Sequence, residues 1–167
     1  MADLKDELRE LLDKQAITEK LYEYCRSMDR MDEELGKACF HEDAVADYGV
    51  GVFQGTGHGF VEMCMKAHPM FHSHAHQLAN ILIWIKGENQ ALSESYVDAT
   101  LRRIDEEGNA YDIRNLGRYV DEWEKREGTW RISDRKYLLD FDQSGSNAGI
   151  FETTSKRDRS DPSYFGD

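Results

Sequence analysis

Cysteine is scarce in this 167-residue chain. The three cysteines, Cys25, Cys39 and Cys64, lie far apart, their number is odd, and no two of them have CxxC spacing. A disulfide-stapled protein or a domain folded around thiolate-bound zinc is a poor fit to this pattern. The sequence therefore favours the reducing environment of the cytoplasm.

Long apolar runs are also missing. The longest, from Ile81 to Ile85, is far too short to cross a bilayer. Residues 1–7 are rich in charge and lack the apolar segment of a secretory signal peptide. We expect neither a membrane span nor a cleaved leader.

Basic residues are few relative to acidic ones. Lysine and arginine number 21 against 33 aspartates and glutamates, which gives a net charge of −12. Such a chain repels phosphate backbones and anionic lipids, so nucleic acids and membrane surfaces are not expected as partners. The acidic residues are spread along the chain and form no long block, which is typical of a solvated surface.

The length fits one domain, and no repeat at a fixed period divides it. Apolar residues recur about every 3.6 positions over 4–28, which predicts a long amphipathic helix with a break near Gln15. The elements expected next are a short helix over 31–39, a strand over 44–48, a hairpin arm over 50–53 and a helix over 58–66.

After Pro69 the chain is rich in Ile, Val, Tyr, Trp and Thr, with glycine-containing turns between the apolar stretches. This pattern predicts an antiparallel meander of four strands, over 72–86, 91–104, 109–124 and 129–140. Twist would curl such a sheet around the helices and leave a hollow. We predict one α+β domain over residues 1–143 and a polar carboxyl-terminal arm over 144–167.

Three of the six histidines alternate at His72, His74 and His76, so on a strand their side chains share one face. The cluster suits either a metal site or an acid–base site that uses one imidazole. The first carboxylate after it is Glu88, which is too distant for the HxE or HxxxE spacing of a local metal site. Ligands from elsewhere, or a purely structural role, stay open.

Asp29 follows the apolar stripe of the first helix. A carboxylate near a helix carboxyl terminus is electrostatically unfavourable because the dipole is negative there, and a protonated imidazole would compensate for it. The alternative is that Asp29 begins the next helix. Tyr24, Tyr48 and Arg135, taken singly, are typical of core or surface positions.

The order of several motifs carries a family resemblance. LYEYCRSMD at 21–29 is followed by FHEDA at 40–44, by the histidine cluster, by YVDEWEKREGTWRI at 119–132 and by Arg135. Over about residues 5–143 this order resembles the SnoaL-like branch of the nuclear-transport-factor-2-like superfamily. The resemblance implies a cone-shaped α+β barrel, in which a curved antiparallel sheet wraps around amino-terminal helices. It also implies a homo-oligomer, either a dimer or a trimer.

Within that superfamily, Asp29 and His76 resemble the Asp–His dyad of lindane dehydrochlorinase, scytalone dehydratase and bile acid 7α-dehydratase, which need no cofactor. The resemblance implies that His76 is the general base, that Asp29 orients it, and that Tyr24, Tyr48 and Arg135 share the site. It predicts a cofactor-independent, metal-free lyase. Such an enzyme would eliminate water, halide or an aldehyde such as formaldehyde from a hydrophobic cyclic or aromatic molecule.

The residues expected to bind the substrate are His72, His74, Phe53, Phe71, Trp84, Asn80 and Leu139. The superfamily also contains isomerases, polyketide cyclases and non-catalytic members such as dioxygenase small subunits. The alternatives are therefore an isomerase or cyclase with the same dyad, or a binder without catalysis.

Overall fold

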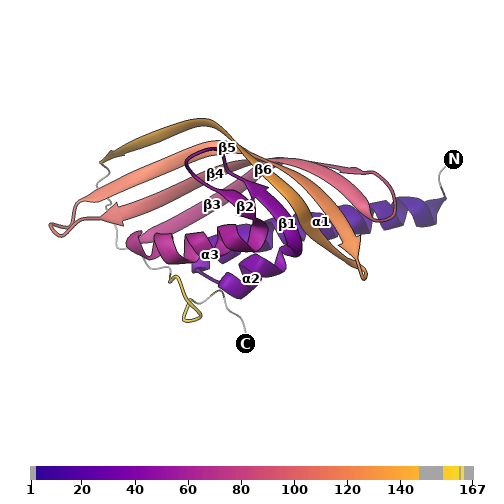
Figure 1. Ribbon diagram of the computed structural model, residues 1–167, viewed down its shortest axis with the longest axis horizontal. Coiled ribbons are helices and arrows are strands. Elements are labelled where there is room, and N and C mark those ends of the chain that lie inside the picture. Colours follow the sequence, from indigo (N-terminus) through magenta and orange to yellow (C-terminus); the bar gives the residue numbers. More distant parts are fainter. Residues whose placement is uncertain (1–2, 147–155, 162, 164–167) are drawn as a thin grey trace.

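The computed structural model describes residues 3–146, 156–161 and 163. Three helices lie on one side of a curved six-stranded sheet (Figure 1). The elements in chain order are α1 (Leu4–Arg30), α2 (Glu33–Ala38), β1 (Phe40–Asp47), β2 (Gln54–Thr56), α3 (Gly57–Ala67), the short 3₁₀ helix η1 (His68–Met70), β3 (Ser73–Ile85), β4 (Gln90–Ile104), β5 (Ala110–Arg126) and β6 (Thr129–Ser146). This architecture confirms the predicted α+β class.

The strand order in the sheet is β2-β1-β6-β5-β4-β3. The four long strands β3 to β6 form the predicted antiparallel meander, whereas β1 joins β6 in parallel, with Ala46 opposite Arg135. Because β2 and β3 stay at opposite edges, the sheet curves without closing into a barrel. The concave side of the sheet faces the helices (Figure 1).

Helix α1 is continuous, so the predicted break near Gln15 is wrong. The Gln15 amide donates a 2.7 Å hydrogen bond to Glu19, one turn further along the same helix. Asp3 caps the amino terminus, and acidic residues in the first turn complement the helix dipole. The helix ends at Met31, which adopts a left-handed conformation with φ 55° and donates its N–H to the Ser27 carbonyl.

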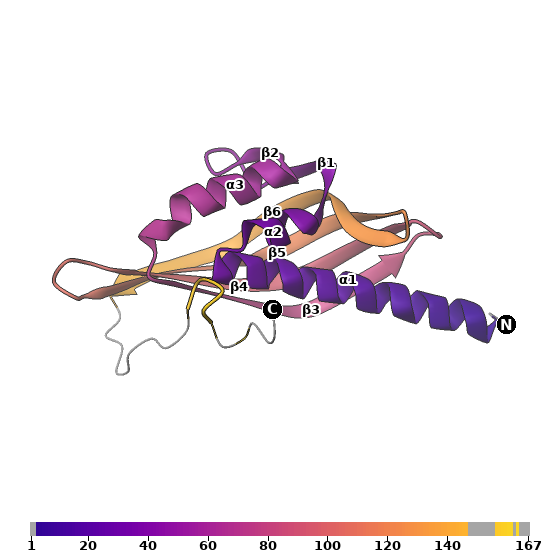
Figure 2. The same ribbon diagram turned by 90° about the horizontal axis from the view of Figure 1, so that it is seen from below.

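The apolar stripe of α1 has two different halves. Its carboxyl-terminal half is buried through Ile17 and Leu21, whereas Leu4, Leu8 and Leu11 in the amino-terminal half are exposed. In Figure 2 the first turns of α1 project beyond the end of the sheet. Periodicity therefore identified the helix but not how much of it is covered.

A β-bulge divides β3. Ala79 pairs with Tyr96 and Leu82 pairs with Glu94, so β3 has one more residue than β4 across this interval. Asn80 sits in the bulge with a positive φ of 49°. Because side chains alternate along a strand, one extra residue exchanges the inward and outward positions beyond it.

The segment after β1 differs from the prediction. The hairpin arm expected over 50–53 is a turn, and the strand that pairs with β1 is β2. Gly49 and Gly51 have φ of 89° and 92°, which other residues rarely adopt, so they allow the chain to turn before β2 begins.

The sequence predicts that the domain ends at residue 143, whereas β6 continues to Ser146. The division into a domain and an arm stays a prediction, because most of 144–167 lies outside the described residues.

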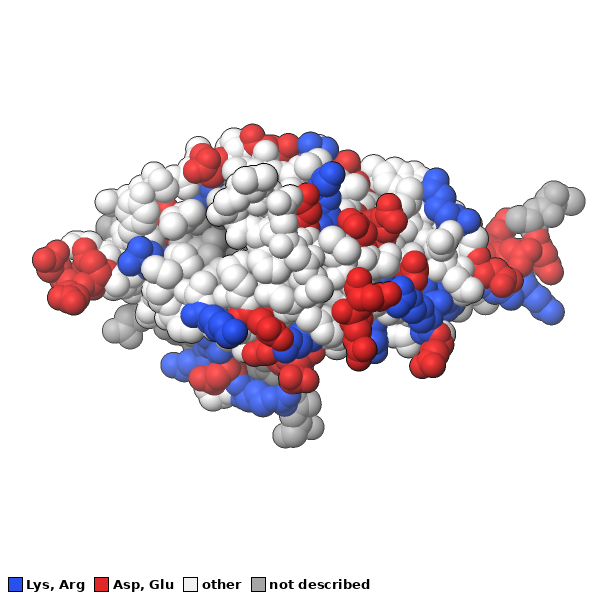
Figure 3. Space-filling view, viewed as in Figure 1, with Lys and Arg blue, Asp and Glu red and all other residues white. Residues whose placement is uncertain are grey.

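Among the residues that are described, no helix is long and apolar enough to cross a membrane. On the face shown in Figure 3, charged side chains gather at the two ends and the lower edge, and the centre is largely uncharged.

Candidate active site

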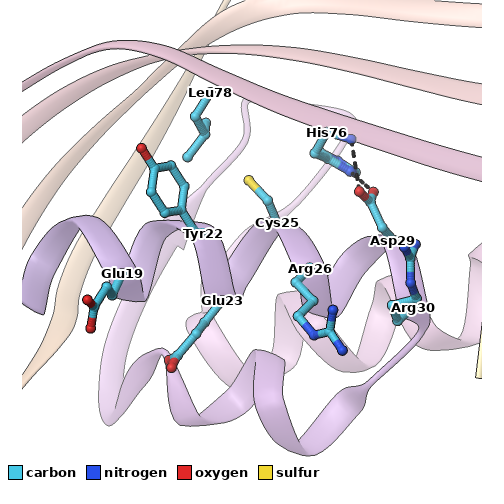
Figure 4. A pocket seen from close by; sticks show the side chains of 9 residues that line it. All are labelled: Glu19, Tyr22, Glu23, Cys25, Arg26, Asp29, Arg30, His76 and Leu78. Carbon is cyan, nitrogen blue, oxygen red and sulfur yellow. Dashed lines mark hydrogen bonds and ion pairs between the residues drawn. The ribbon is translucent and has the colours of Figure 1, made fainter. Parts of the chain in front are cut away.

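Asp29 and His76 are 47 positions apart and meet where the last turn of α1 packs on β3 (Figure 4). Asp29 Oδ1 lies 2.6 Å from His76 Nδ1, and Oδ2 accepts a 3.1 Å hydrogen bond from the His76 backbone N–H. A carboxylate accepts and does not donate, so Nδ1 carries the proton and Nε2 is left as the basic nitrogen. The two side chains are 16% and 9% exposed, which shields the bond from water.

Asp29 lies inside α1, so the alternative that it begins the second helix is wrong. That helix is capped by Asp32, whose side chain accepts from the Leu35 N–H at 3.1 Å. The two N–H donors of His76 provide the compensation that a carboxylate at a helix carboxyl terminus needs.

His76 also lines a cavity of about 250 Å³ between the sheet and the helices. Most of the lining is apolar, and it comes from α1, α3 and the inward face of β4 to β6. The polar groups on the wall are His68, His76, Asn115 and the hydroxyls of tyrosines. A concave, mostly apolar space with a few converging polar groups is the usual form of a small-molecule site.

Two tyrosines form a hydrogen-bonded pair on this wall. The hydroxyls of Tyr24 and Tyr48 are 2.8 Å apart, and both rings line the cavity. Burial raises the pKa of each phenol well above its ordinary value, with Arg135 opposing the shift. Both hydroxyls therefore stay protonated at neutral pH and can donate hydrogen bonds.

Arg135 lies behind the cavity wall and does not line it. Its guanidinium is fully buried and binds Asp121 through two hydrogen bonds of 2.7 and 2.8 Å. It also packs on the rings of Tyr24 and Tyr119, at 4.3 and 4.0 Å from their centroids. Arg135, which the resemblance placed in the site, therefore does not contact the cavity directly, and its guanidinium lies next to the tyrosine rings.

A second, more open groove of about 540 Å³ lies on the other side of the dyad (Figure 4). Glu19, Glu23, Arg26 and Asp29 of α1 line it together with residues of β3. His76 lines both spaces, so the dyad stands between the mostly apolar cavity and a more open groove that several charged side chains line.

The SnoaL-like domain family matches residues 9–136, which include the dyad and the cavity-lining strands as far as β6. The chain belongs to this family. The recognition made from the sequence motifs is thereby confirmed. A search of the curated proteins found no match to the chain.

Several solved structures share this fold. A provisionally assigned scytalone dehydratase from Novosphingobium aromaticivorans has 23% identity and a TM-score of 0.71, over 87% of this chain and 97% of that one. The type 3 hexachlorocyclohexane dehydrochlorinase LinA from Novosphingobium barchaimii has 18% identity and a TM-score of 0.69, over 88% and 98%.

A third relative has a different role. It is the β subunit of a provisionally assigned aromatic-ring-hydroxylating dioxygenase from Novosphingobium aromaticivorans, with 18% identity and a TM-score of 0.64, over 79% and 92% of the two chains. At these identities the similarities establish the fold alone.

The three alternating histidines of this SnoaL-like domain have different surroundings. His76 binds Asp29, while His74 is buried and donates through Nδ1 to the Met28 carbonyl at 3.2 Å. His72 precedes β3 and is exposed. Among the residues that the structure describes, no three His, Cys, Asp or Glu side chains gather as metal ligands would.

The predicted substrate-binding residues are mostly outside the cavity. Leu139 lines it, whereas Phe53 and Phe71 pack beside it, against Phe60 and His68 respectively. Asn80 is exposed in the bulge.

Trp84 is 45% exposed and points to the outer face of the sheet. The bulge is the cause, because it reverses the alternation between His76 and Trp84.

Several lining residues were missed in the sequence. Val97, Ala99 and Leu101 occupy alternate positions of β4, and Asn115 and Tyr119 share one face of β5. Because side chains alternate along a strand, the sequence indicates that the residues of each set share one face of the sheet. Which of the two faces is concave depends on where the helices pack, and local sequence does not encode that.

Proposed function

We propose that this protein is a cofactor-independent lyase that acts on a compact hydrophobic cyclic or aromatic molecule. The observation that carries the proposal is the Asp29–His76 pair at the wall of a mostly apolar cavity. Nδ1 is committed to the carboxylate, which leaves Nε2 as the one basic ring nitrogen available to a molecule in the cavity.

The proposed reaction begins with His76. Nε2 removes a proton from a carbon or hydroxyl of the substrate, and the electron pair that is released forms a new double bond. The leaving group departs from the neighbouring carbon with its own bonding pair. Asp29 holds the ring in the required tautomer and stabilises the imidazolium that forms, as the carboxylate of a catalytic triad does.

The hydroxyl pair of Tyr24 and Tyr48 is the proposed acid. One phenol donates its proton, or a hydrogen bond, to the departing group, and the other stabilises the charge left behind. Arg135, packed on the Tyr24 ring at 4.3 Å, acts as a positioning residue, because its positive charge opposes the rise in the phenol pKa that burial causes.

The substrate class follows from the cavity. A volume of about 250 Å³ suits a compact ring system, and Tyr48 and Phe60, whose rings stack at 3.6 Å, offer it a flat apolar wall. Structural relatives bear the names of a dehydratase and a hexachlorocyclohexane dehydrochlorinase, which supports water or halide as the leaving group. Release of an aldehyde begins with the same proton transfer and belongs to the same proposal.

The test is turnover by the purified protein on a panel of hydroxylated, halogenated and hydroxymethyl-substituted cyclic and aromatic compounds. We expect His76→Ala and Asp29→Asn to lower kcat/KM by roughly 10²–10⁴-fold while the circular dichroism spectrum and melting temperature stay near those of the parent. His72→Gln is the matched control, since His72 is exposed and outside the cavity. Full activity in a folded His76→Ala protein would refute the proposal.

The same panel separates the alternatives. A lyase releases water, halide or aldehyde, so the product loses mass, whereas an isomerase or cyclase of the same dyad gives a product of equal mass. A protein that binds panel compounds without converting any of them would instead be a non-catalytic member, the role that the dioxygenase β subunit among its relatives suggests.

A further inference from the structure

A short carboxyl-terminal segment, made of Lys156–Asp161 and Ser163, contacts both of the elements that carry the dyad. In Figure 2 this segment, drawn in yellow, lies beside the carboxyl-terminal end of α1. It is about 80 positions beyond β3 in the chain, so these contacts are purely tertiary. It has a part on the β3 side and a part on the α1 side.

Arg157 makes the contacts on the β3 side. Its guanidinium donates to the backbone carbonyls of Phe71 and His68, the latter at 3.2 Å, and so holds the chain that leads into β3. Its Nη2 is also 3.4 Å from both ring nitrogens of His74. Arg157 does not line the cavity, so an effect on the dyad must pass through these neighbours.

His74 connects Arg157 to the helix. Its Nδ1 donates to the Met28 carbonyl, and Met28 directly precedes Asp29. The same strand binds Asp29 through the backbone N–H and the ring of His76. His74 and His76 therefore attach neighbouring residues of α1 to β3, and Arg157 supports the first of these two attachments.

Asp161 makes the contacts on the α1 side. It is buried, lies 3.4 Å from the Nε of Arg30, and accepts hydrogen bonds from the Lys156 and Ser163 backbone N–H groups. The Ser163 hydroxyl and carbonyl in turn accept from Arg26 at 3.1 Å each. Arg30 directly follows Asp29, so the segment contacts the same helix turn that carries the dyad carboxylate.

We propose that this segment is a positioning clamp for the Asp29–His76 pair, with Arg157 and Asp161 as its two contact points. The inference rests on the proposed function. The dyad joins a helix end to an edge strand, and its 2.6 Å bond persists only while both are held in register. By bridging the two elements, the segment preorganises His76 with its proton on Nδ1.

The test uses Arg157→Ala and Asp161→Asn in the full-length protein. Lys156→Ala and Asp158→Asn are matched controls, because they remove the same charges from exposed positions of the same segment. The first readout needs no substrate: ¹⁵N NMR of the His76 imidazole reports the tautomer and the exchange rate of the Nδ1 proton. We expect that proton to exchange about tenfold faster in both clamp variants, as loss of fixed geometry implies, and unchanged in the controls.

The second readout is turnover. In the clamp variants we expect kcat to fall about tenfold or more with KM nearly unchanged, since neither residue touches the cavity, and Arg157→Lys to recover part of the loss. Wild-type tautomer and exchange in folded Arg157→Ala and Asp161→Asn would overturn the clamp, as would equal effects in the controls. If Arg157→Ala does not fold, Arg157→Lys and Asp161→Asn provide the same comparison. Disturbed NMR signals in a protein that turns over no substrate would support the clamp and refute the proposed function.

Discussion

The hydroxyls of Tyr24 and Tyr48, which both line the cavity, share a hydrogen bond of 2.8 Å. Because burial raises the pKa of both phenols, each keeps its proton through the neutral range and well above it. In the proposed reaction, the two neutral phenols and the imidazole of His76 would divide the acid and base roles between different residues. The surroundings of each group, and not its residue type alone, decide which role it takes.

We expect Tyr48→Phe to lower kcat about 10²-fold, because it removes one member of the hydroxyl pair and leaves the aromatic wall in place. Tyr137→Phe is the matched control, since Tyr137 lines the same cavity but its hydroxyl is outside that pair. Steady-state kinetics on the best panel substrate measure both. Equal losses in the two variants would show that the pair has no special part in the reaction.

At the scale of elements, the junction of α1, η1 and β3 depends on histidines that stay neutral. Burial, followed by the positive charge of Arg157, lowers the pKa of His74 to about 3, and burial lowers that of His68 to about 4. His76 faces both and contributes to both shifts. Neutral His74 keeps its Nδ1 proton on the Met28 carbonyl.

This junction should make stability depend on pH. An unfolded histidine takes up a proton near pH 6.5, long before folded His74 does, so the free energy of unfolding falls as pH drops below about 6.5. Urea unfolding at pH 7.5 and 4.5 should show a loss about 2 kcal/mol larger in the wild type than in His74→Gln, which cannot titrate. His72→Gln should behave like the wild type. Identical curves for the wild type and His74→Gln would contradict the expectation.

Most elements were predictable because their patterns are local. The period of 3.6 located α1, and the alternation of apolar residues between turns located β3 to β6. The errors have tertiary causes. The helix continues through Gln15, which donates a hydrogen bond to Glu19 one turn further along. The bulge at Asn80 reverses the side of the sheet on which Trp84 lies, and no local pattern in the sequence predicts this bulge.

At the scale of the whole molecule, all the helices of the described residues lie on one side of the sheet, and none of them covers its outer face (Figure 1). Exposed apolar side chains lie there among ion pairs such as Arg118 with Glu94 and Asp140. The apolar members are Leu82, Trp84, Leu92, Tyr96, Val120 and Phe141. A sheet face on which exposed apolar side chains lie among ion pairs is a frequent site of association between copies of a chain.

We expect a homo-oligomer, a dimer or a trimer, that forms through this face. Tyr96→Glu should shift the mass measured by light scattering to that of the monomer, because it places a charge at the centre of the apolar set. Leu8→Glu is the comparison, since Leu8 is also exposed but lies in the amino-terminal half of α1 and not on the sheet. A monomeric wild type, or dissociation by Leu8→Glu alone, would show that the sheet face is not the interface.

The sequence alone determined the class of fold, the helix and strand segments, and the membership of Asp29 and His76 in a family pattern. These follow from local periodicity and from motifs, which are properties of neighbouring residues. The tertiary structure decided which ring nitrogen is free, that Arg135 lies behind the cavity wall, and that a distant segment contacts neighbours of the dyad through Arg157 and Asp161. Those features depend on how the end of α1 packs on the edge strand β3. Residues that are 47 or more positions apart make these contacts, so no short segment of the sequence predicts them.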